Sequence, residues 1–225
     1  MSINTLNLNT TQVEETGGGQ IGRISASYPF AKLTVTRYCL TLNMGIMGKV
    51  LFRPSEVISI EPASMIKTGI RIKHRVGNYK ENVVFTCSGR EADLIARIEQ
   101  SGFLNNMDPL LPADIEAEIA QAQASGSFGL RIWFVVCFIA IWNSLPLAGI
   151  VDVFTTHNFT KLILAARVDI GILALLTILV LFVPAVQQRA VKPGFYIKDM
   201  RSTLYFILLV GAVIFLALSF LPHQL

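Results

Sequence analysis

The sequence lacks the usual marks of an enzyme or a metalloprotein. It has few histidines and cysteines, and they are scattered rather than spaced as metal ligands: His74, His157 and His223; Cys39, Cys87 and Cys137. Nucleophile-elbow, Ser-x-x-Lys and His-Glu-x-x-His patterns do not occur. We therefore expect no enzyme activity, no metal and no cofactor, and we interpret the three cysteines as free thiols in a reducing compartment.

The N-terminus has neither the basic start nor the apolar centre of a secretory signal. Residues 1–24 are rich in Asn, Thr, Gly and Glu, which predicts a flexible tail. The stretch "GGGQIG" matches a G-x-G-x-x-G pattern, but a dinucleotide-binding loop needs a strand before it and a helix after it. Here a polar segment precedes the glycines and a strand follows, so we interpret them as a linker.

Apolar residues, by contrast, are abundant. They make up 52% of the chain, the mean hydropathy is +0.55, and three long apolar runs follow Gly129. Each run is close to the ~20 residues that a membrane-spanning helix needs. Buried core helices are the alternative, but three almost charge-free runs joined by short polar loops favour spans. The sequence thus predicts transmembrane helices over about 130–151, 162–186 and 203–221.

Basic residues in the loops predict the orientation of these helices. The loop between the second and third spans is rich in cations: Arg189, Lys192, Lys198 and Arg201. Because cytoplasmic loops carry an excess of Lys and Arg, we expect this loop and the N-terminal domain to be cytoplasmic, with the C-terminus outside. The prediction is a multi-pass protein integral to a plasma membrane of the bacterial inner-membrane type.

A few polar residues interrupt the predicted spans, namely Asn143, Asp152, Arg167 and Asp169. An ionisable residue in a span indicates function by default. These charges, however, lie near the expected interfaces, where a long side chain can reach water. We expect a structural contact between Asp152 and Arg167 on neighbouring helices.

The region before the spans has the alternation of strands. "PFAKLTVT", "RYCLTLNM", "GKVLFR", "EVISIEP", "GIRIKHRV" and "VVFTC" are separated by turn residues, and the helical segment "SGREADLIARIEQSGF" follows. About six or seven strands followed by one helix predict an α+β unit. We expect a small antiparallel β-barrel capped by a C-terminal helix, ahead of the three transmembrane helices.

Residues 25–104 resemble a pleckstrin-homology (PH) or GRAM-like domain of bacterial type. The resemblance rests on "LTVTRYCLTLNMGIMGKVLFRPSEVISIEPA", "GIRIKHRV", "NVVFTC" and "READLIARIEQSGF". It implies a PH-like barrel that binds lipid head groups or proteins, and it does not imply catalysis. The dense basic run lies in a later hairpin than the phosphoinositide-binding cluster typical of PH domains.

Residues 105–129 form a predicted acidic linker. Pro109 and Pro112 break the chain, "ADIEAEIAQAQA" suggests a short helix, and "SGSFG" suggests a flexible joint. From Glu91 to Gly129 there are seven acidic residues and one basic residue, whereas Gln20 to Arg90 has 11 basic and three acidic residues.

The densest cations lie on one face of the strand "GIRIKHRV", where Arg71, Lys73 and Arg75 alternate with apolar residues. With Lys67 and Lys80 they form the predicted binding site for anionic lipid or an acidic protein surface. Two alternatives remain open at this point: the acidic linker covers the basic segment, or both are simply solvated.

These observations favour a membrane-anchored, non-enzymatic protein whose cytoplasmic PH-like domain binds a protein partner or anionic lipid head groups. The alternative is a small transporter or channel subunit regulated by that domain, which would need a homo-oligomer to line a path. Nucleic-acid binding is disfavoured, because the basic region lacks clustered aromatics.

Overall fold

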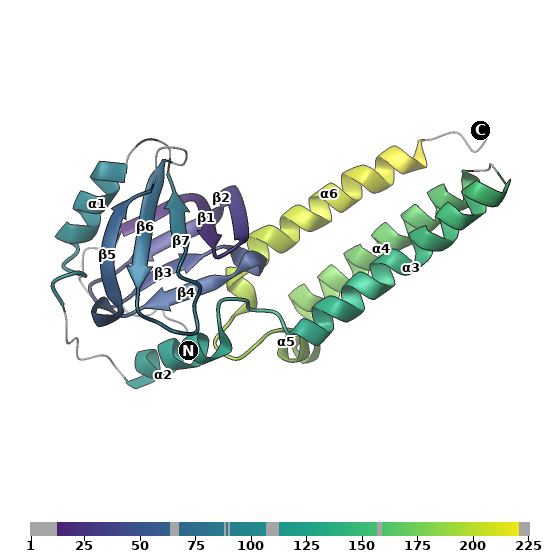
Figure 1. The fold of residues 1–225 in the computed structure, drawn as a ribbon. Coiled ribbons are helices and arrows are strands. Elements are labelled where there is room, and N and C mark those ends of the chain that lie inside the picture. Colours follow the sequence, from purple (N-terminus) through teal and green to yellow (C-terminus); the bar gives the residue numbers. More distant parts are fainter. Residues whose placement is uncertain are drawn as a thin grey trace. The chain divides into compact units, whose positions relative to one another are not determined.

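The computed structural model describes residues 13–63, 68–87, 89, 91–106, 113–156 and 159–220. Within this range the chain forms two compact units (Figure 1). The barrel unit contains the residues up to Gly129 together with Pro193–Asp199, and the helical unit contains Leu130–Lys192 and the residues from Met200 onward.

The barrel unit is built on seven antiparallel strands. They are β1 (Val13–Ile21), β2 (Ile24–Val35), β3 (Leu40–Asn43), β4 (Lys49–Phe52), β5 (Val57–Pro62), β6 (Gly69–His74) and β7 (Val83–Thr86). The order across the sheet is β4-β3-β2-β1-β7-β6-β5. Strands that follow one another in the chain are neighbours, except β4 and β5, which stand at the two ends of the order. The first and last strands of the chain, β1 and β7, also pair, and the sheet forms a nearly closed barrel (Figure 1). The predicted strands and the α+β class are therefore confirmed.

The first strand corrects our interpretation of the N-terminal segment. β1 occupies the middle of the sheet and pairs with both β2 and β7, so the prediction of a flexible tail is wrong from Val13 onward; residues 1–12 lie outside the described range. The glycines are structural rather than a linker. A Cβ at Gly17 would lie 2.2 Å from the Thr86 carbonyl oxygen, so β1 approaches β7 too closely for a side chain there.

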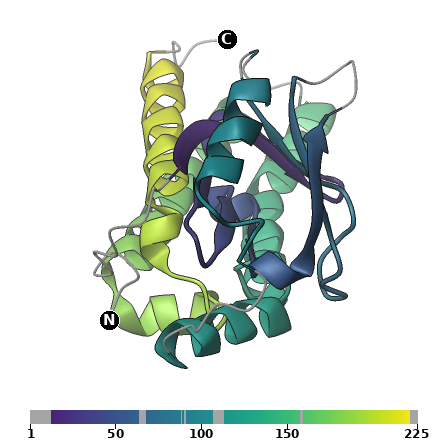
Figure 2. The same cartoon turned by 90° about the vertical axis from the view of Figure 1, so that its left-hand side faces the viewer.

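The barrel core follows the predicted alternation. Ile70 and Ile72 of β6 are fully buried, as are Leu33 and Leu42 of β2 and β3. Helix α1 (Glu91–Gln100) lies across one end of the barrel (Figures 1 and 2) and buries its Leu94 and Ile98 in this core. The predicted capping helix is thus confirmed.

Helix α2 (Ala113–Ser125) belongs to the barrel unit and is not the separate linker that we expected. Its Ile119 is fully buried against Leu51 of β4. The Gln123 side-chain amide donates to the Leu51 carbonyl at 3.1 Å and to Glu56 Oε2 at 2.7 Å. Because Glu56 directly precedes β5, α2 joins the two strands that end the sheet. The Gln123 amide thereby satisfies one backbone carbonyl of the edge strand β4.

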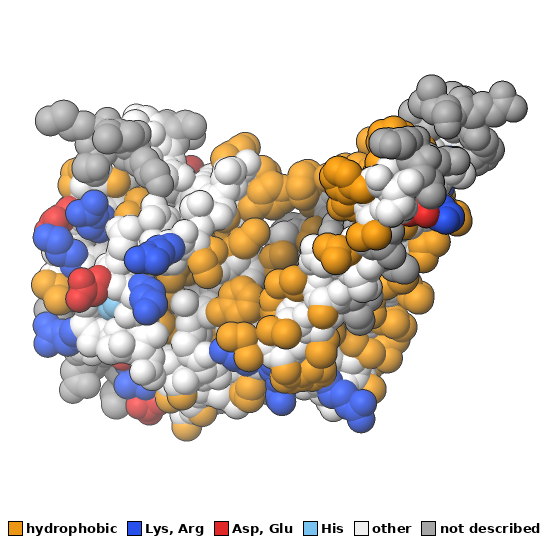
Figure 3. Space-filling view, turned by 45° about the vertical axis from the view of Figure 1, so that its right-hand side comes forward, with side chains coloured by type: hydrophobic (Ala, Val, Ile, Leu, Met, Phe, Trp, Pro, Cys, Tyr) orange, Lys and Arg blue, Asp and Glu red, His pale blue; other side chains and the backbone are white. Residues whose placement is uncertain are grey.

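The helical unit contains α3 (Ile132–Thr156), α4 (Thr160–Phe182), α5 (Pro184–Ala190) and α6 (Arg201–Ser219). By length and composition, α4 and α6 could each cross a membrane. Most of the exposed large hydrophobic side chains of the described residues lie on α3, α4 and α6, and Figure 3 shows them covering the visible helix surfaces. Such exposed apolar surface suits lipid contact. The second predicted span ends early, at Phe182, because Pro184 starts a new helix.

Candidate functional site

The outer face of β6 carries the cations that the sequence singled out. Arg71 pairs in register with Glu61 of β5, and Lys73 pairs with Ser59. Lys73 Nζ forms an ion pair of 2.9 Å with Glu61, to which the Ser59 hydroxyl also donates at 2.8 Å. The hydrogen bond from Lys73, followed by that from Ser59, lowers the pKa of the Glu61 carboxyl. The neighbouring strand therefore already neutralises Lys73.

Three other cations keep their charge available, and we call them the outer cations: Arg71, Arg75 and Lys80. None forms an ion pair with another described residue, and Arg71 Nε is buried without a hydrogen-bond partner among them. Lys80 packs across the β1–β2 turn, where a Cβ on Gly22 would lie 2.8 Å from its Cγ. Lys and Arg side chains are accordingly prominent on the barrel surface in Figure 3. Lys67 lies outside the described residues.

His74 has a structural position at the end of β6. Its ring centroid lies 4.8 Å from that of Phe52, with the two planes tilted by 31°, and it meets the Tyr79 ring edge-on at 6.2 Å. Its Nε2 lies 3.0 Å from the Lys80 carbonyl oxygen, which holds the β6–β7 loop. These contacts agree with our interpretation of His74 as a residue of the barrel face.

Sequence reasoning missed a second site, in which Pro193–Asp199 docks on the barrel. We call this segment the clasp; we expected all of it to be an open cytoplasmic loop. Phe195 and Ile197 are buried, and Ser125 donates to the Pro193 carbonyl at 2.9 Å. Gly194 has φ +84°, and a Cβ there would lie 2.8 Å from the Ala122 nitrogen, so glycine permits this close approach to α2.

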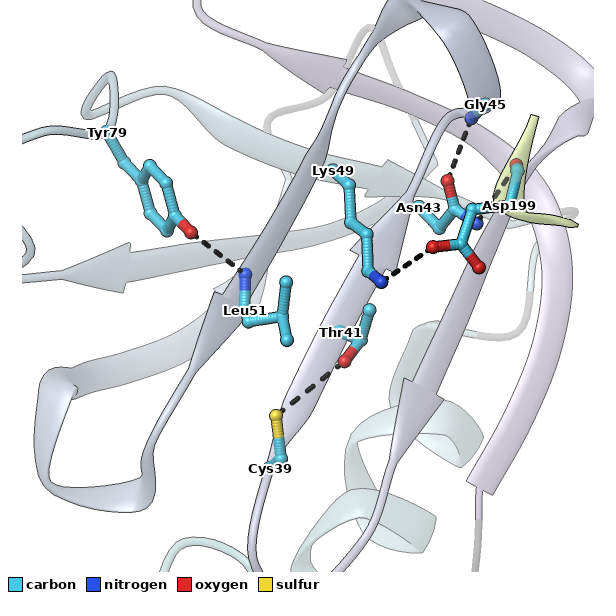
Figure 4. A network of polar contacts seen from close by, with 8 residues as sticks. All are labelled: Cys39, Thr41, Asn43, Gly45, Lys49, Leu51, Tyr79 and Asp199. Atoms are coloured by element: carbon cyan, nitrogen blue, oxygen red, sulfur yellow. Dashed lines mark hydrogen bonds and ion pairs between the residues drawn. The ribbon is translucent and has the colours of Figure 1, made fainter. Parts of the chain in front are cut away.

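An ion pair anchors the clasp (Figure 4). Lys49 of β4 is only 5% exposed, and its Nζ lies 2.7 Å from Asp199 Oδ2. The Asn43 side-chain amide donates to the Asp199 carbonyl at 3.3 Å, while its oxygen accepts from Gly45 N–H at 2.9 Å. The Tyr196 ring lies 5.8 Å from Lys49 Nζ. Since a buried ammonium group needs a counter-charge, Lys49 and Asp199 depend on each other.

The charged residues of the helical unit have partners of their own. Asp152 forms an ion pair of 2.7 Å with Lys161, and Arg167 donates to the Leu218 carbonyl near the end of α6. The expected contact between Asp152 and Arg167 stays a prediction. A cation at a helix C-terminus meets unpaired carbonyl groups and the negative end of the helix dipole. Asn143 donates to Ile139 of its own helix at 2.7 Å.

Asp169 is the most unusual of the predicted polar residues. It is 4% exposed within α4, and its Oδ1 has no hydrogen-bond partner among the described residues.

Neither unit offers a metal centre within the described residues, where no group of three His, Cys, Asp or Glu side chains comes together. Comparisons with protein-family models, with curated proteins and with solved structures find no match to this chain. Functional inference therefore rests on the charges, the clasp and the apolar helices.

Proposed function

We propose that this protein is a membrane-anchored, non-enzymatic binding protein whose barrel unit presents the outer cations to an anionic ligand. Seven antiparallel strands followed by a helix that plugs the core support the resemblance to PH and GRAM-like domains. The carrying observation is that Arg75 and Lys80 are exposed and unpaired among the described residues, in the same hairpin as Arg71. Such cations attract anionic lipid head groups or acidic protein surfaces.

The clasp supports three membrane crossings. Residues up to Gly129 and the clasp belong to one compact unit, so we infer that both lie on the same side of a membrane. The chain between them must then cross an even number of times. Because α4 is long and apolar enough to cross once, α3 would supply the return crossing. α6 would make a third crossing and carry the C-terminus to the opposite side.

Charge supports a cytoplasmic barrel; the plasma membrane of bacterial inner-membrane type is part of the proposal. The helix ends that adjoin the barrel unit in the chain carry Arg131, Arg189, Lys192 and Arg201, with no acidic residue in the helical unit near them in sequence. The opposite ends carry two acids and two bases, Asp152, Lys161, Arg167 and Asp169. The positive-inside rule then places the basic ends, and with them the barrel, in the cytoplasm.

Vesicle flotation with the full-length protein tests the ligand. The protein is placed in phosphatidylcholine nanodiscs and mixed with vesicles that contain either 30% phosphatidylserine or phosphatidylcholine alone. We expect binding to the anionic vesicles only, and we expect salt to weaken it. Each cation near the surface contributes about 1 kcal/mol, so Arg75→Gln should lower the binding constant about fivefold and Arg71→Gln/Arg75→Gln/Lys80→Gln about a hundredfold.

Lys32→Gln is the matched control, because it removes one positive charge that is already paired with Glu14 at 2.6 Å. It should bind like the wild type. Equal binding to neutral and anionic vesicles would rule out the lipid ligand. The same variants in pull-downs with membrane extracts then test an acidic protein partner, whose capture should depend on the outer cations.

Asp169 favours a second candidate function, that of a transporter or channel subunit regulated by the barrel. A buried carboxyl group in an apolar helix is costly, and such groups often mark an ion or proton path. Measurements of ion and proton flux into liposomes, with the wild type and with Asp169→Asn, would decide between the two functions. Loss of flux with normal membrane insertion supports transport, and the absence of flux in the wild type removes this candidate.

A further inference from the structure

The start of α3 and the end of α5 form a charged junction within the helical unit. Leu130 and Val191 make an antiparallel bridge, and Arg131 N–H donates to the Ala190 carbonyl at 2.8 Å. Arg131 Nε also approaches the Val191 carbonyl at 3.4 Å. These bonds hold Arg131 beside the chain segment that carries Arg189, although 58 positions separate the two arginines in the sequence.

Among the described residues of the helical unit, no acidic side chain neutralises this junction. The two acidic residues of this unit are Asp152 and Asp169. Asp152 lies 20 residues beyond the start of α3, about 30 Å along the helix, and Asp169 lies 13 residues before the end of α4, about 20 Å. Arg131 and Arg189 are both exposed, and neither forms an ion pair with a described residue. In Figure 3, Lys and Arg side chains stand without an acidic neighbour at one end of the helices, whereas the other end shows an acidic and a basic side chain together.

The junction also has an apolar border. Directly after Arg131, Ile132 is 77% and Trp133 is 49% exposed, and Phe182 at the end of α4 is 67% exposed. Cations beside exposed aliphatic and aromatic side chains are typical of the membrane interface, where lipid head groups meet acyl chains. The N-terminus of α3 adds the positive end of a 25-residue helix dipole to the same place.

We propose that Arg131 and Arg189 together bind the phosphate of an anionic phospholipid, whose acyl chains lie along Ile132 and Trp133. Two guanidinium groups satisfy a phosphate with directed, charge-assisted hydrogen bonds, which lysines cannot reproduce as well. This site rests on the proposed membrane insertion of α3 and α4. It does not depend on the ligand of the barrel.

Trp133 is a natural reporter for this site. The full-length Trp142→Phe protein is reconstituted in phosphatidylcholine with increasing fractions of phosphatidylglycerol whose acyl chains are brominated, because bromine quenches nearby tryptophan fluorescence. Brominated phosphatidylcholine serves as the non-anionic reference. We expect phosphatidylglycerol to be preferred at Trp133 about thirtyfold, and the preference to fall to about one in Arg131→Gln/Arg189→Gln. Arg131→Lys/Arg189→Lys should keep only part of it.

Two controls separate this site from other effects. Lys161→Gln removes a cation at the opposite helix ends and Arg75→Gln removes one from the barrel; both should leave the quenching unchanged, so loss of barrel binding and loss of this site are distinguishable. Inorganic phosphate at 10 mM should not relieve the quenching. Relief by phosphate would assign the junction to a soluble anion, and equal quenching by the two brominated lipids in the wild type would overturn the proposal.

Discussion

The clasp gives the sharpest test of the structure, through the substitution Lys49→Met. Methionine keeps the length of the apolar stem and removes the ammonium group that faces Asp199 at 2.7 Å. Removal of one partner from a buried ion pair costs about 3–5 kcal/mol. The Asp199 side chain keeps 17% of its surface exposed and can regain some hydration, so we expect a smaller cost than this range, about 2–3 kcal/mol.

The rate of trypsin cleavage after Lys198 measures this loss in the full-length protein, reconstituted in vesicles with the barrel outward. Lys198 is followed by Asp199 and becomes cleavable when the clasp opens, while Lys192 is protected by the following Pro193. When opening and closing are fast, cleavage follows the population of the open form. An opening free energy lowered by 2–3 kcal/mol corresponds to cleavage about 30- to 150-fold faster. Because Lys49→Met leaves the cleavage site at Lys198 unchanged, a faster cleavage reports the opening of the clasp.

Lys73→Met is the matched control, because it deletes a lysine from a half-exposed pair on the same sheet. It should leave cleavage at Lys198 close to the wild-type rate. Circular dichroism verifies that both variants keep their strands. Wild-type cleavage in Lys49→Met, with the fold intact, would refute the conclusion that this ion pair holds the clasp.

The remaining predictions concern the barrel. Burial raises the pKa of the Cys39 thiol to about 11, so iodoacetamide at pH 8 should modify it about a hundredfold more slowly in the folded protein than in urea; equal rates would contradict its burial. Burial also raises the pKa of Tyr79. As the pH rises, the unfolded state loses the protons of Cys39 and Tyr79 at a lower pH than the folded state does. The free energy of unfolding should therefore fall as the pH rises from about 8.5 through 11. Melting temperatures at pH 8 and 10 measure this fall, and Cys39→Ala should reduce it. Gly17→Val should lower the free energy of unfolding in urea by about 1–3 kcal/mol, because the valine side chain would enter the β1–β7 contact. Gly77→Val, with open space around it, should be nearly neutral, and equal effects of the two would exclude the tight β1–β7 approach.

Strands β2 to β7 could be predicted because each alternates or concentrates apolar residues between turn signals. Ile70 and Ile72, for example, point into the core on the predicted parity. β1 could not be predicted in this way. Glycines are unfavourable in strands, and Gly17–Gly19 form one only because β2 and β7 on either side supply hydrogen bonds and demand close approach.

The sites were predictable only where the chemistry is local. The basic residues of β6 were visible as a pattern, but the neutralisation of Lys73 depends on the register with β5. The clasp gave no comparable signal, since Lys49 and Asp199 are 150 residues apart. The single hint is "KVLF", a strand whose four residues are all buried and whose first is a lysine. A buried lysine demands an acidic partner, but the sequence does not say which one.

The division of the barrel unit between two stretches of chain sets the order in which the protein can mature. Seventy residues separate Gly129 from Asp199, and a ribosome needs about 4–14 s to make them. During that interval the nascent barrel unit holds Lys49 without its counter-ion, while the apolar helices α3 and α4 are made. Translation thus completes the barrel unit only after α3 and α4 have been made. A chain truncated before Pro193 would carry a permanent defect that cellular quality control can recognise.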